Sequence, residues 1–485
     1  MNAHILENLL SMVLLTLVVA QNPGAPVASA RSAMAEDGID LAVRNLELTQ
    51  GVPDEPLILG KLTAARVQIV LTPNTNLDAQ VQLEVDGKTY ERTVNLTGPA
   101  VTVTLKVDAP REVKPITATV FVTPTGQTTG PNLSDHSKTV TYQTVQTTER
   151  VVAFFLPVDW TPEERSKYDY NNAFKQHVQE AGGFLVSTYP LPTHQVIVDY
   201  TMTPHMLSPF EQTLVDSQGK FNMRNALALY ANLSFAGRRY RPDATMVVGV
   251  LPPGWFRAHG QPGTLGFTLS DVKGIVTGQY GSNLPPIIAA HEIGHLYSLD
   301  EDYDFAIKPN RPCTPVLLPS YWAEHEMELI DTSAKRLCTF MSAASSQDNY
   351  WVDQRIYDYL LGKFALNGGA ASAPLVLAAT MTWRVESDGS PGRTSANVHR
   401  FEPSQPVYVS VAGIALRAGS TLEAKLYRGD TLLRALAPQT TTAGNRWYPF
   451  LTAKAHSLPE DIYRVDIYLD GRLAKSNQFE VKTSQ

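Results

Sequence analysis

The sequence predicts a multidomain protein in which a central α/β domain lies between two antiparallel β-sandwich domains. Three observations support this fold class. The chain has 485 residues, which is too long for a single hydrophobic core. Its first and last parts contain short segments in which apolar and polar residues alternate, as they do in strands with one buried face. The middle part instead combines continuous apolar runs with helical segments, which is typical of an α/β domain.

Composition and charge limit the classes of function. Hydrophobic residues make up 43% of the chain and charged residues 18%, as in soluble globular proteins. The formal net charge is -7, so a strongly basic surface for nucleic acid or for anionic lipid is not expected. We therefore expect no nucleic-acid partner.

Residues 1–36 are expected to form a leader. Residues 9–20 (LLSMVLLTLVVA) form an apolar run that is short for a membrane span and has the length of a secretory signal core. Val18 and Ala20 fit the small residues before a cleavage site. Residues 1–8 contain no Lys or Arg, which leaves an uncleaved anchor or a misassigned start codon as alternatives. The leader predicts a secreted or cell-surface protein without a transmembrane span in its mature form.

Residues 37–147 are expected to form the first sandwich. Asp86 and Gly87 favour a tight hairpin turn between two alternating segments, because both residues tolerate positive φ angles. Short strands at this spacing resemble those of immunoglobulin-like domains. We interpret this domain as a spacer, a folding aid or a binding module. Strand patterning is found at residues 66–71, 81–85, 101–105 and 119–122.

Residues 148–366 are expected to form the α/β domain. Residues 151–156 and 246–251 are continuous apolar runs, as in strands that are buried on both faces. Residues 263–268 and 274–276 are candidates for an edge strand, to which an extended peptide can add through backbone hydrogen bonds. Helices are expected near residues 171–180 and 222–232.

Residues 374–485 are expected to form the second sandwich. The preceding segment, residues 367–373, has small residues and reads as a flexible linker. Turn residues follow at positions 428–430 and 470–471. Strand patterning is found at residues 407–411, 422–427 and 463–468.

The motif HEIGH at residues 291–295 carries the chemistry. The pair Pro285-Pro286 suits the start of a helix, and apolar residues lead from it into the motif. On a helix, His291 and His295 project from one face at positions i and i+4. Glu292 is rotated off that line, where it can reach a metal-bound water without binding the metal. Two histidines make a loose site, so a third protein ligand is expected before zinc is held with one open position.

Beyond His295 the chain reads LYSLDEDYD at residues 296–304, with four acidic residues. This run resembles the metzincin zinc peptidases, whose motif has a glycine three residues after the second histidine and a third ligand three residues further on. Within that clan it looks most like the immunoglobulin-A peptidase group, whose motif ends in two acids and a tyrosine. The resemblance implies an endopeptidase for protein or peptide substrates. It also implies that His291, His295 and Glu301 bind Zn²⁺ and that Glu292 is the general base.

Two positions depart from the metzincin pattern. Ser298 stands where the family has glycine, and a left-handed residue other than glycine costs about 1 kcal/mol. The acid at the third-ligand position is a glutamate, so Asp300 or Asp302 is an alternative to Glu301. A further alternative is a carboxylate from a second helix near residues 323–328, which would resemble the gluzincin arrangement. Its candidates are Glu324, Glu326 and Glu328.

Met341 and two cysteines are expected to support the site. The resemblance implies that Met341 lies in a tight turn below the metal and gives it an apolar floor; an ordinary buried methionine is the alternative. The tyrosine that some metzincins place two residues later is Ala343 here, so no tyrosine is assigned a catalytic role. Cys313 and Cys338 are the two cysteines of the chain. In an exported protein we expect them to form a disulfide worth about 3 kcal/mol, with two buried thiols as the alternative.

The resemblance therefore implies a secreted zinc metalloendopeptidase. The alternative is a surface binding or adhesion protein in which the two sandwiches bind the partner and the middle domain is a degenerate peptidase. Ser298 and the missing tyrosine support that alternative.

Overall fold

β-strands are more extensive than helices in the described chain, and separate sheets divide it into several domains. The described residues from Asp40 onward form one compact unit. None of the described helices has the length and apolar character needed to cross a membrane. The leader, residues 1–36 with Val18 and Ala20, lies outside the described residues. The computed structural model describes residues 40–52, 54–72, 76–125, 133–216, 218, 220–261, 266–268, 274–277, 285–299, 320–324, 326–330, 337–341, 349–392 and 398–483.

Two sheets with a shared apolar core form the N-terminal sandwich, in the orders β1-β3-β6 and β5-β4-β7-β8. Burial alternates strictly along β4, so every second side chain enters the core. Asp86 and Gly87 have φ angles of 49° and 79° between the paired residues Val85 and Lys88, which is the tight turn that the sequence predicts. The strands are β1 (Asp40–Thr49), β3 (Thr63–Thr72), β4 (Asn76–Val85), β5 (Lys88–Thr97), β6 (Ala100–Val107), β7 (Ile116–Pro124) and β8 (Ser137–Tyr142).

A five-stranded sheet in the order β11-β10-β12-β14-β13 forms the middle of the chain. Strands β10 (Val151–Pro157), β11 (Val196–Tyr200), β12 (Met246–Val250) and β14 (Gly274–Thr277) are parallel, and β13 (Gly266–Thr268) is antiparallel to β14. Both β10 and β12 are buried along their full length, as their continuous apolar sequences predict.

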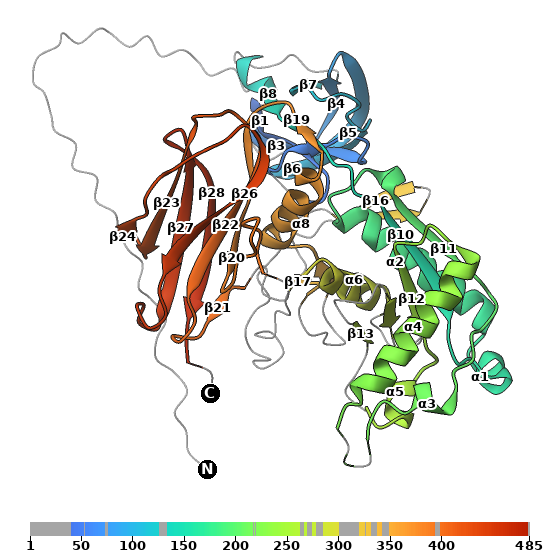
Figure 1. Cartoon of the computed structure of the whole chain (residues 1–485). Coiled ribbons are helices and arrows are strands. Elements are labelled where there is room, and N and C mark those ends of the chain that lie inside the picture. Colours follow the sequence, from blue (N-terminus) through green and yellow to red (C-terminus); the bar gives the residue numbers. More distant parts are fainter. Residues whose placement is uncertain are drawn as a thin grey trace, which may run out of the picture. The chain divides into compact units, whose positions relative to one another are not determined.

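Helices cover both faces of this sheet (Figure 1). Phe155 of β10 belongs to the core shared with α2 (Tyr170–Thr188), α6 (Pro285–Leu296) and α8 (Gln354–Leu366). Phe154 belongs to the opposite core, shared with α4 (Met223–Tyr240) and α5 (Trp255–Ala258). Three short elements lie in the connections between these strands and helices: α1 (Pro162–Lys167), η2 (Thr193–Gln195) and α3 (Pro209–Gln212).

Two glycines let helices approach the sheet closely. A Cβ at Gly182 of α2 would lie 3.1 Å from a methyl of Val198, and one at Gly237 of α4 would lie 2.5 Å from a methyl of Val247. Helix α2 contains Gly182 and Gly183 and continues past them to Thr188, beyond the predicted end at residue 180.

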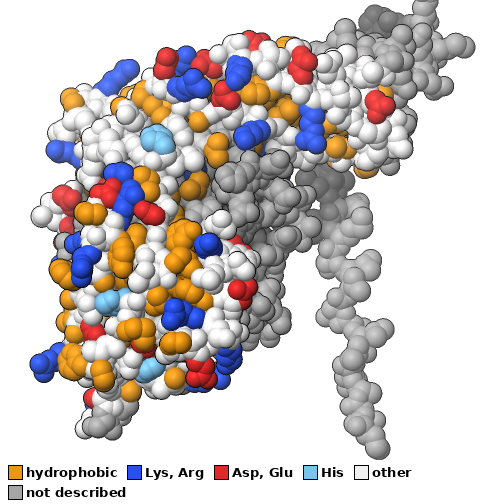
Figure 2. Space-filling view, turned by 90° about the vertical axis from the view of Figure 1, so that its right-hand side faces the viewer, with side chains coloured by type: hydrophobic (Ala, Val, Ile, Leu, Met, Phe, Trp, Pro, Cys, Tyr) orange, Lys and Arg blue, Asp and Glu red, His pale blue; other side chains and the backbone are white. Residues whose placement is uncertain are grey.

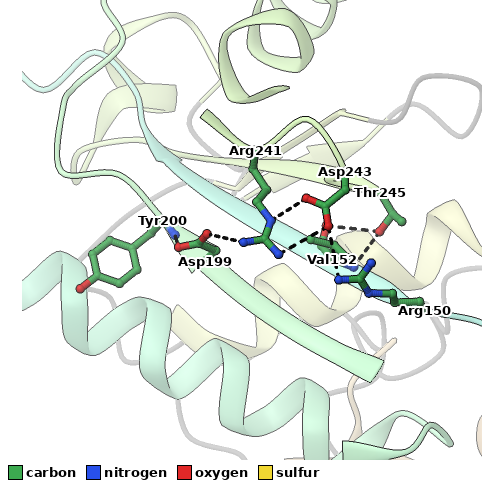
Figure 3. Close-up of polar contacts among 7 residues, drawn as sticks. All are labelled: Arg150, Val152, Asp199, Tyr200, Arg241, Asp243 and Thr245. Carbon is green, nitrogen blue, oxygen red and sulfur yellow. Dashed lines mark hydrogen bonds and ion pairs between the residues drawn. The ribbon is translucent and has the colours of Figure 1, made fainter. Parts of the chain in front are cut away.

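Ion pairs fasten the turn between α4 and β12 to the neighbouring strands (Figure 3). Arg241 pairs with Asp199 at 3.0 Å and with Asp243 at 2.7 Å. Asp243 also pairs with Arg150 at 3.3 Å, directly before β10. Each partly exposed pair contributes little alone, but the connected set fixes where β10 and β12 begin.

Helix α4 carries an apolar stripe on its outer surface. Met223, Leu227 and Phe235 lie at intervals of four and eight residues, with 50%, 44% and 68% of their surface exposed. Figure 2 shows the side of the molecule that lies at the right in Figure 1, where hydrophobic side chains lie in groups between Lys and Arg side chains.

The C-terminal sandwich has the sheets β20-β22-β26 and β21-β28-β27-β23-β24 around its own core. Its strands pair in an antiparallel manner, except that the two-residue strand β21 runs parallel to β28. The strands are β20 (Leu375–Thr382), β21 (Arg400–Phe401), β22 (Val407–Leu416), β23 (Thr421–Arg428), β24 (Thr431–Ala435), β25 (Gln439–Thr440), β26 (Gly444–Ala453), β27 (Asp461–Leu469) and β28 (Arg472–Val481).

A small sheet in the order β19-β9-β2 joins segments that are far apart in the sequence. It contains β2 (Leu57–Ile58), β9 (Thr144–Gln146) and β19 (Ala370–Ala371). The expectation of a flexible linker at residues 367–373 is therefore wrong, because part of that segment is a paired strand. A Cβ at Gly369 would lie 2.3 Å from the carbonyl oxygen of Gln146, so this close backbone approach requires glycine.

Lys61 ties the N-terminal sandwich to the end of α2. Its ammonium group donates to the carbonyl oxygens of Val186 at 2.6 Å and Tyr189 at 2.8 Å. A cation at this position is favourable because carbonyl groups at a helix C-terminus carry partial negative charge. Burial nevertheless lowers the pKa of Lys61 to about 7.

Candidate metal centre

Helix α6 places the two motif histidines side by side. The helix begins at Pro285, as the proline pair predicts, and both histidines lie in its second half. The Nε2 atoms of His291 and His295 are 3.1 Å apart. Both side chains are partly buried, so the nitrogens face each other with little surrounding solvent.

Backbone carbonyl groups fix the orientation of both imidazole rings. The Nδ1 atom of His291 lies 2.9 Å from the carbonyl oxygen of Phe340, and that of His295 lies 2.9 Å from the carbonyl oxygen of Leu299. A carbonyl oxygen can only accept, so each Nδ1 donates a proton and each Nε2 keeps its lone pair. Outer hydrogen bonds of this kind orient histidine ligands in metal sites.

The surroundings favour the neutral form of both rings. Burial, and then the neighbouring His295, lower the pKa of His291 to about 4. Burial also lowers the pKa of His295, while its hydrogen bond to Leu299 acts in the opposite direction. At neutral pH both imidazoles are therefore neutral, which is the form that binds metal ions.

This pair of donors fits zinc. Two neutral imidazoles whose Nε2 lone pairs face each other at 3.1 Å repel unless a cation lies between them. Two nitrogens bound to one tetrahedral zinc ion at about 2.0–2.1 Å are roughly 3.3 Å apart, close to the observed separation.

The chain leaves α6 through a tight turn that ends at Leu299, the last described residue before the candidate third ligands. The amide of Leu299 donates to the carbonyl oxygen of Gly294 at 3.2 Å, and that of Ser298 donates to that of His295 at 2.9 Å. This pair of bonds is a Schellman motif, and Ser298 has the left-handed φ of 72° that the motif requires.

The three candidates for a third ligand lie outside the part of the chain that the structure describes. Asp300, Glu301 and Asp302 are not among the described residues. Among those that are, no three His, Cys, Asp or Glu side chains form a group that could hold a metal ion. The choice among the three acids therefore stays a prediction.

The alternative of a second helix that supplies a carboxylate is wrong. Glu324 belongs to β15 (Ser320–Glu324), and Glu326 and Glu328 belong to β16 (Glu326–Ile330). These two strands pair in an antiparallel manner. The alternating sequence of apolar and acidic residues in β16 is a strand pattern, which the expectation of a helix overlooked.

Met341 lies directly against the motif helix. Its side chain is fully buried, and a Cβ at Gly294 would lie 2.5 Å from its sulfur atom. The preceding residue, Phe340, provides the carbonyl group that holds His291. One short segment thus packs under α6 and orients one of its histidines.

The cysteine prediction stays open. Cys338 lies in β17 (Leu337–Thr339), which runs parallel to β18 (Asn349–Trp351). Cys313 lies outside the described residues. The proposed disulfide is therefore neither supported nor contradicted.

Glu292 lies between α6 and the edge strand of the sheet. Only 5% of its surface is exposed, and a Cβ at Gly266 of β13 would lie 2.8 Å from its Oε1 atom. Tyr230 of α4 donates from its hydroxyl group to the carbonyl oxygen of Phe267 at 2.6 Å. Burial, and then the nearby Glu292, raise the pKa of Tyr230. The carboxylate is thus placed beside the strand that borders the site.

Tyr189 is a supporting residue that the sequence analysis missed. It is fully buried, and its hydroxyl group donates to the carbonyl oxygen of Ala290 at 3.0 Å, one residue before His291. Its ring packs against Phe340 and Tyr297. Support of this kind acts on backbone atoms, which give no side-chain pattern in the sequence.

Comparisons with known proteins assign this chain to no family. No protein-family model matches it, and no characterised protein matches it. Among solved structures it is similar to OgpA from Akkermansia muciniphila, with 11% identity, 70% of this chain and 93% of that chain covered, and a TM-score of 0.27. It is also similar to the CARDB domain of PF1109 from Pyrococcus furiosus, with 16% identity, 24% and 99% covered, and a TM-score of 0.19. TM-scores this low do not indicate a shared fold or function.

Proposed function

We propose that this protein is a secreted or cell-surface zinc-dependent endopeptidase with a metzincin-like central domain. The observation that carries the proposal is the convergence of two neutral imidazoles, whose Nε2 atoms lie 3.1 Å apart and whose Nδ1 atoms are both held by backbone carbonyl groups. This arrangement provides two oriented nitrogen ligands on one helix.

The site residues divide the work between binding and proton transfer. His291 and His295, with Glu301 as the expected third ligand, would hold the zinc ion. A bound zinc ion polarises a carbonyl group and lowers the pKa of water to about 7. Glu292 takes a proton from the attacking water and passes it to the leaving amine. Its place beside β13 supports this role, because the carboxylate lies at the border between helix and edge strand.

The edge strand β13 supports a peptide as the substrate. It ends the central sheet within the described residues, and Gly266 leaves room for Glu292 next to it. An extended peptide that pairs with β13 presents its backbone beside the carboxylate, and main-chain hydrogen bonds hold such a peptide whatever its sequence.

Two substitutions test the proposal. Glu292→Gln should keep the zinc ion and abolish peptide hydrolysis, because the amide cannot accept the proton. His295→Ala should lose the metal. Zinc content by elemental analysis and cleavage of unfolded protein substrates, with and without chelator, measure both outcomes. Glu47→Gln changes another buried glutamate, in the N-terminal sandwich, and should leave both properties unchanged.

Full activity in Glu292→Gln, or full zinc content in His295→Ala, would overturn these assignments. If wild-type protein binds zinc but does not hydrolyse peptides, the adhesion alternative is favoured. Ser298 no longer supports that alternative, since serine adopts the left-handed conformation that the turn requires.

A further inference from the structure

We propose that Tyr359 and Lys363 of α8 are positioning residues of the metal centre, which act on His295 through the turn at residues 297–299. This inference rests on the proposed function, since it assigns the residues a role toward zinc. Neither residue carries a metal-binding motif, and both lie more than sixty positions after His295 in the sequence.

Both side chains converge on one carbonyl oxygen. The hydroxyl group of Tyr359 donates to the carbonyl oxygen of Tyr297 at 2.7 Å, and the ammonium group of Lys363 donates to the same atom at 3.0 Å. Lys363 also lies 3.3 Å from the hydroxyl oxygen of Tyr359, to which it donates. Tyr359 is 2% exposed, so its hydroxyl group makes this contact away from solvent.

The carbonyl group that they hold stands at the end of the motif helix. Tyr297 follows the last residue of α6, and carbonyl groups there carry the partial negative charge of the helix C-terminus. A lysine ammonium group is therefore well placed to bind it. The contact fixes the first residue of the turn.

The last residue of the same turn orients a candidate ligand. Leu299 provides the carbonyl oxygen that accepts from Nδ1 of His295 at 2.9 Å. The turn is thus anchored to α8 at Tyr297 and holds the imidazole at Leu299, with the left-handed Ser298 between them. Two residues further on the chain reaches Glu301.

Helix α8 is itself held by the C-terminal sandwich. A Cβ at Gly362 would lie 2.8 Å from the Cβ of Ala412 in β22, which shows how closely helix and sheet approach. The ring of Tyr359 lies 6.2 Å from that of Trp447 in β26. The C-terminal sandwich therefore takes part in positioning the metal centre, through α8.

Removal of both donors should weaken zinc binding. Without them the carbonyl group of Tyr297 loses one buried and one partly buried hydrogen-bond partner, and the left-handed turn loses the contacts that compensate for its conformation. The acceptor for Nδ1 of His295 then becomes mobile. Loss of outer hydrogen bonds at metal ligands typically weakens metal binding by about 10- to 100-fold.

The test measures zinc dissociation constants by chelator competition for Tyr359→Phe, Lys363→Met and the double variant. We expect the double variant to bind zinc about 10-fold or more weakly, and each single variant less so. Lys363→Arg keeps a cationic donor and should restore most of the affinity. Thermal melting of the metal-free proteins reports folding separately, and the single variants keep the test valid if the double variant does not fold.

Tyr463→Phe is the matched control. Tyr463 is 1% exposed, and its hydroxyl group donates to the carbonyl oxygen of Pro459 at 2.7 Å, within the C-terminal sandwich. This variant should lower the melting temperature by a similar amount and leave the zinc affinity unchanged. An equal loss of zinc affinity in Tyr463→Phe, or wild-type affinity in the folded Tyr359 and Lys363 variants, would overturn the inference. Wild-type protein that binds no zinc would instead overturn the proposed function.

Discussion

His177 is a buried histidine whose two ring nitrogens have no hydrogen-bond partner among the described residues. It lies on α2 with 2% of its surface exposed, and its ring contacts Phe155. Burial lowers its pKa from 6.5 to about 4. Because the unfolded chain binds the proton more readily than the folded one, protonation between these two values favours unfolding.

We therefore expect His177 to make the fold sensitive to acid. Above pH 6.5 His177 is neutral in both states and does not lower the free energy of unfolding. As the pH falls from 6.5 toward 4, protonation of the unfolded chain lowers that free energy. Between pH 7 and pH 5 the loss is about 2 kcal/mol. Urea unfolding at several pH values should show a flatter pH dependence for His177→Met than for wild type. An unchanged slope would mean that other groups cause the acid sensitivity.

Side-chain spacing predicted the three motif residues of the candidate site but not the backbone groups that orient the histidines. His291, Glu292 and His295 follow from their positions on one helix turn. The groups that orient the histidines are the carbonyl groups of Phe340 and Leu299. Every residue has such a group, so its role depends on a tertiary contact that the sequence does not encode locally.

At the scale of elements, the close packing of α6 on Met341 depends on Gly294. A Cβ at this position would lie 2.5 Å from the sulfur of Met341 and 3.1 Å from Leu299 Cδ1. Gly294→Ala should therefore destabilise the protein by about 1–3 kcal/mol, although alanine favours helices.

Shortening Met341 should relieve that strain. Met341→Ala alone leaves a cavity and should cost about 2–5 kcal/mol. In the double variant the two costs should not add, with a coupling of about 1 kcal/mol or more. Denaturant unfolding of the four proteins measures the cycle. Additive costs would mean that Gly294 and Met341 do not compete for the same space.

Elements with local signals were predicted well, and those that depend on distant partners were not. The turn at Asp86 and Gly87 follows from two residues that tolerate positive φ. The strand at residues 370–371 has no pattern of its own, because two alanines become a strand only through pairing with β9. The left-handed Ser298 was predicted from the position of a family glycine, since serine itself gives no such signal.

At the scale of the whole molecule, a buried charge cluster joins the two sandwiches to α8. Lys475 of β28 lies 2.5 Å from Glu55 and 2.9 Å from Asp358 of α8. Gln354 donates to both carboxylates. Burial, and then Asp358, raise the pKa of Glu55 to about 8. The ammonium group of Lys475 thus contacts both acidic side chains where three segments meet, and at neutral pH the raised pKa keeps Glu55 mostly protonated.

Lys475→Met should destabilise the protein strongly, by about 3–5 kcal/mol, because it leaves the two acids buried without their cation. Lys425→Met is the control. Lys425 belongs to the same sandwich but is more exposed and lies 3.7 Å from Glu423, so its loss should cost about 1 kcal/mol or less. Thermal and denaturant unfolding measure both. Equal effects would show that the buried cluster does not hold the domains together.

The strands of the small sheet β19-β9-β2 are synthesised at very different times. Residues 58 and 371 flank residue 145, so the central domain begins and ends at neighbouring strands. During synthesis from the N-terminus, β2 and β9 are available long before β19, and the strands that hold α8 are made last. A growing chain therefore contains the histidine helix well before it contains the support for it. The motif helix α6 therefore reaches its final packing only after α8 and the C-terminal sandwich have been made.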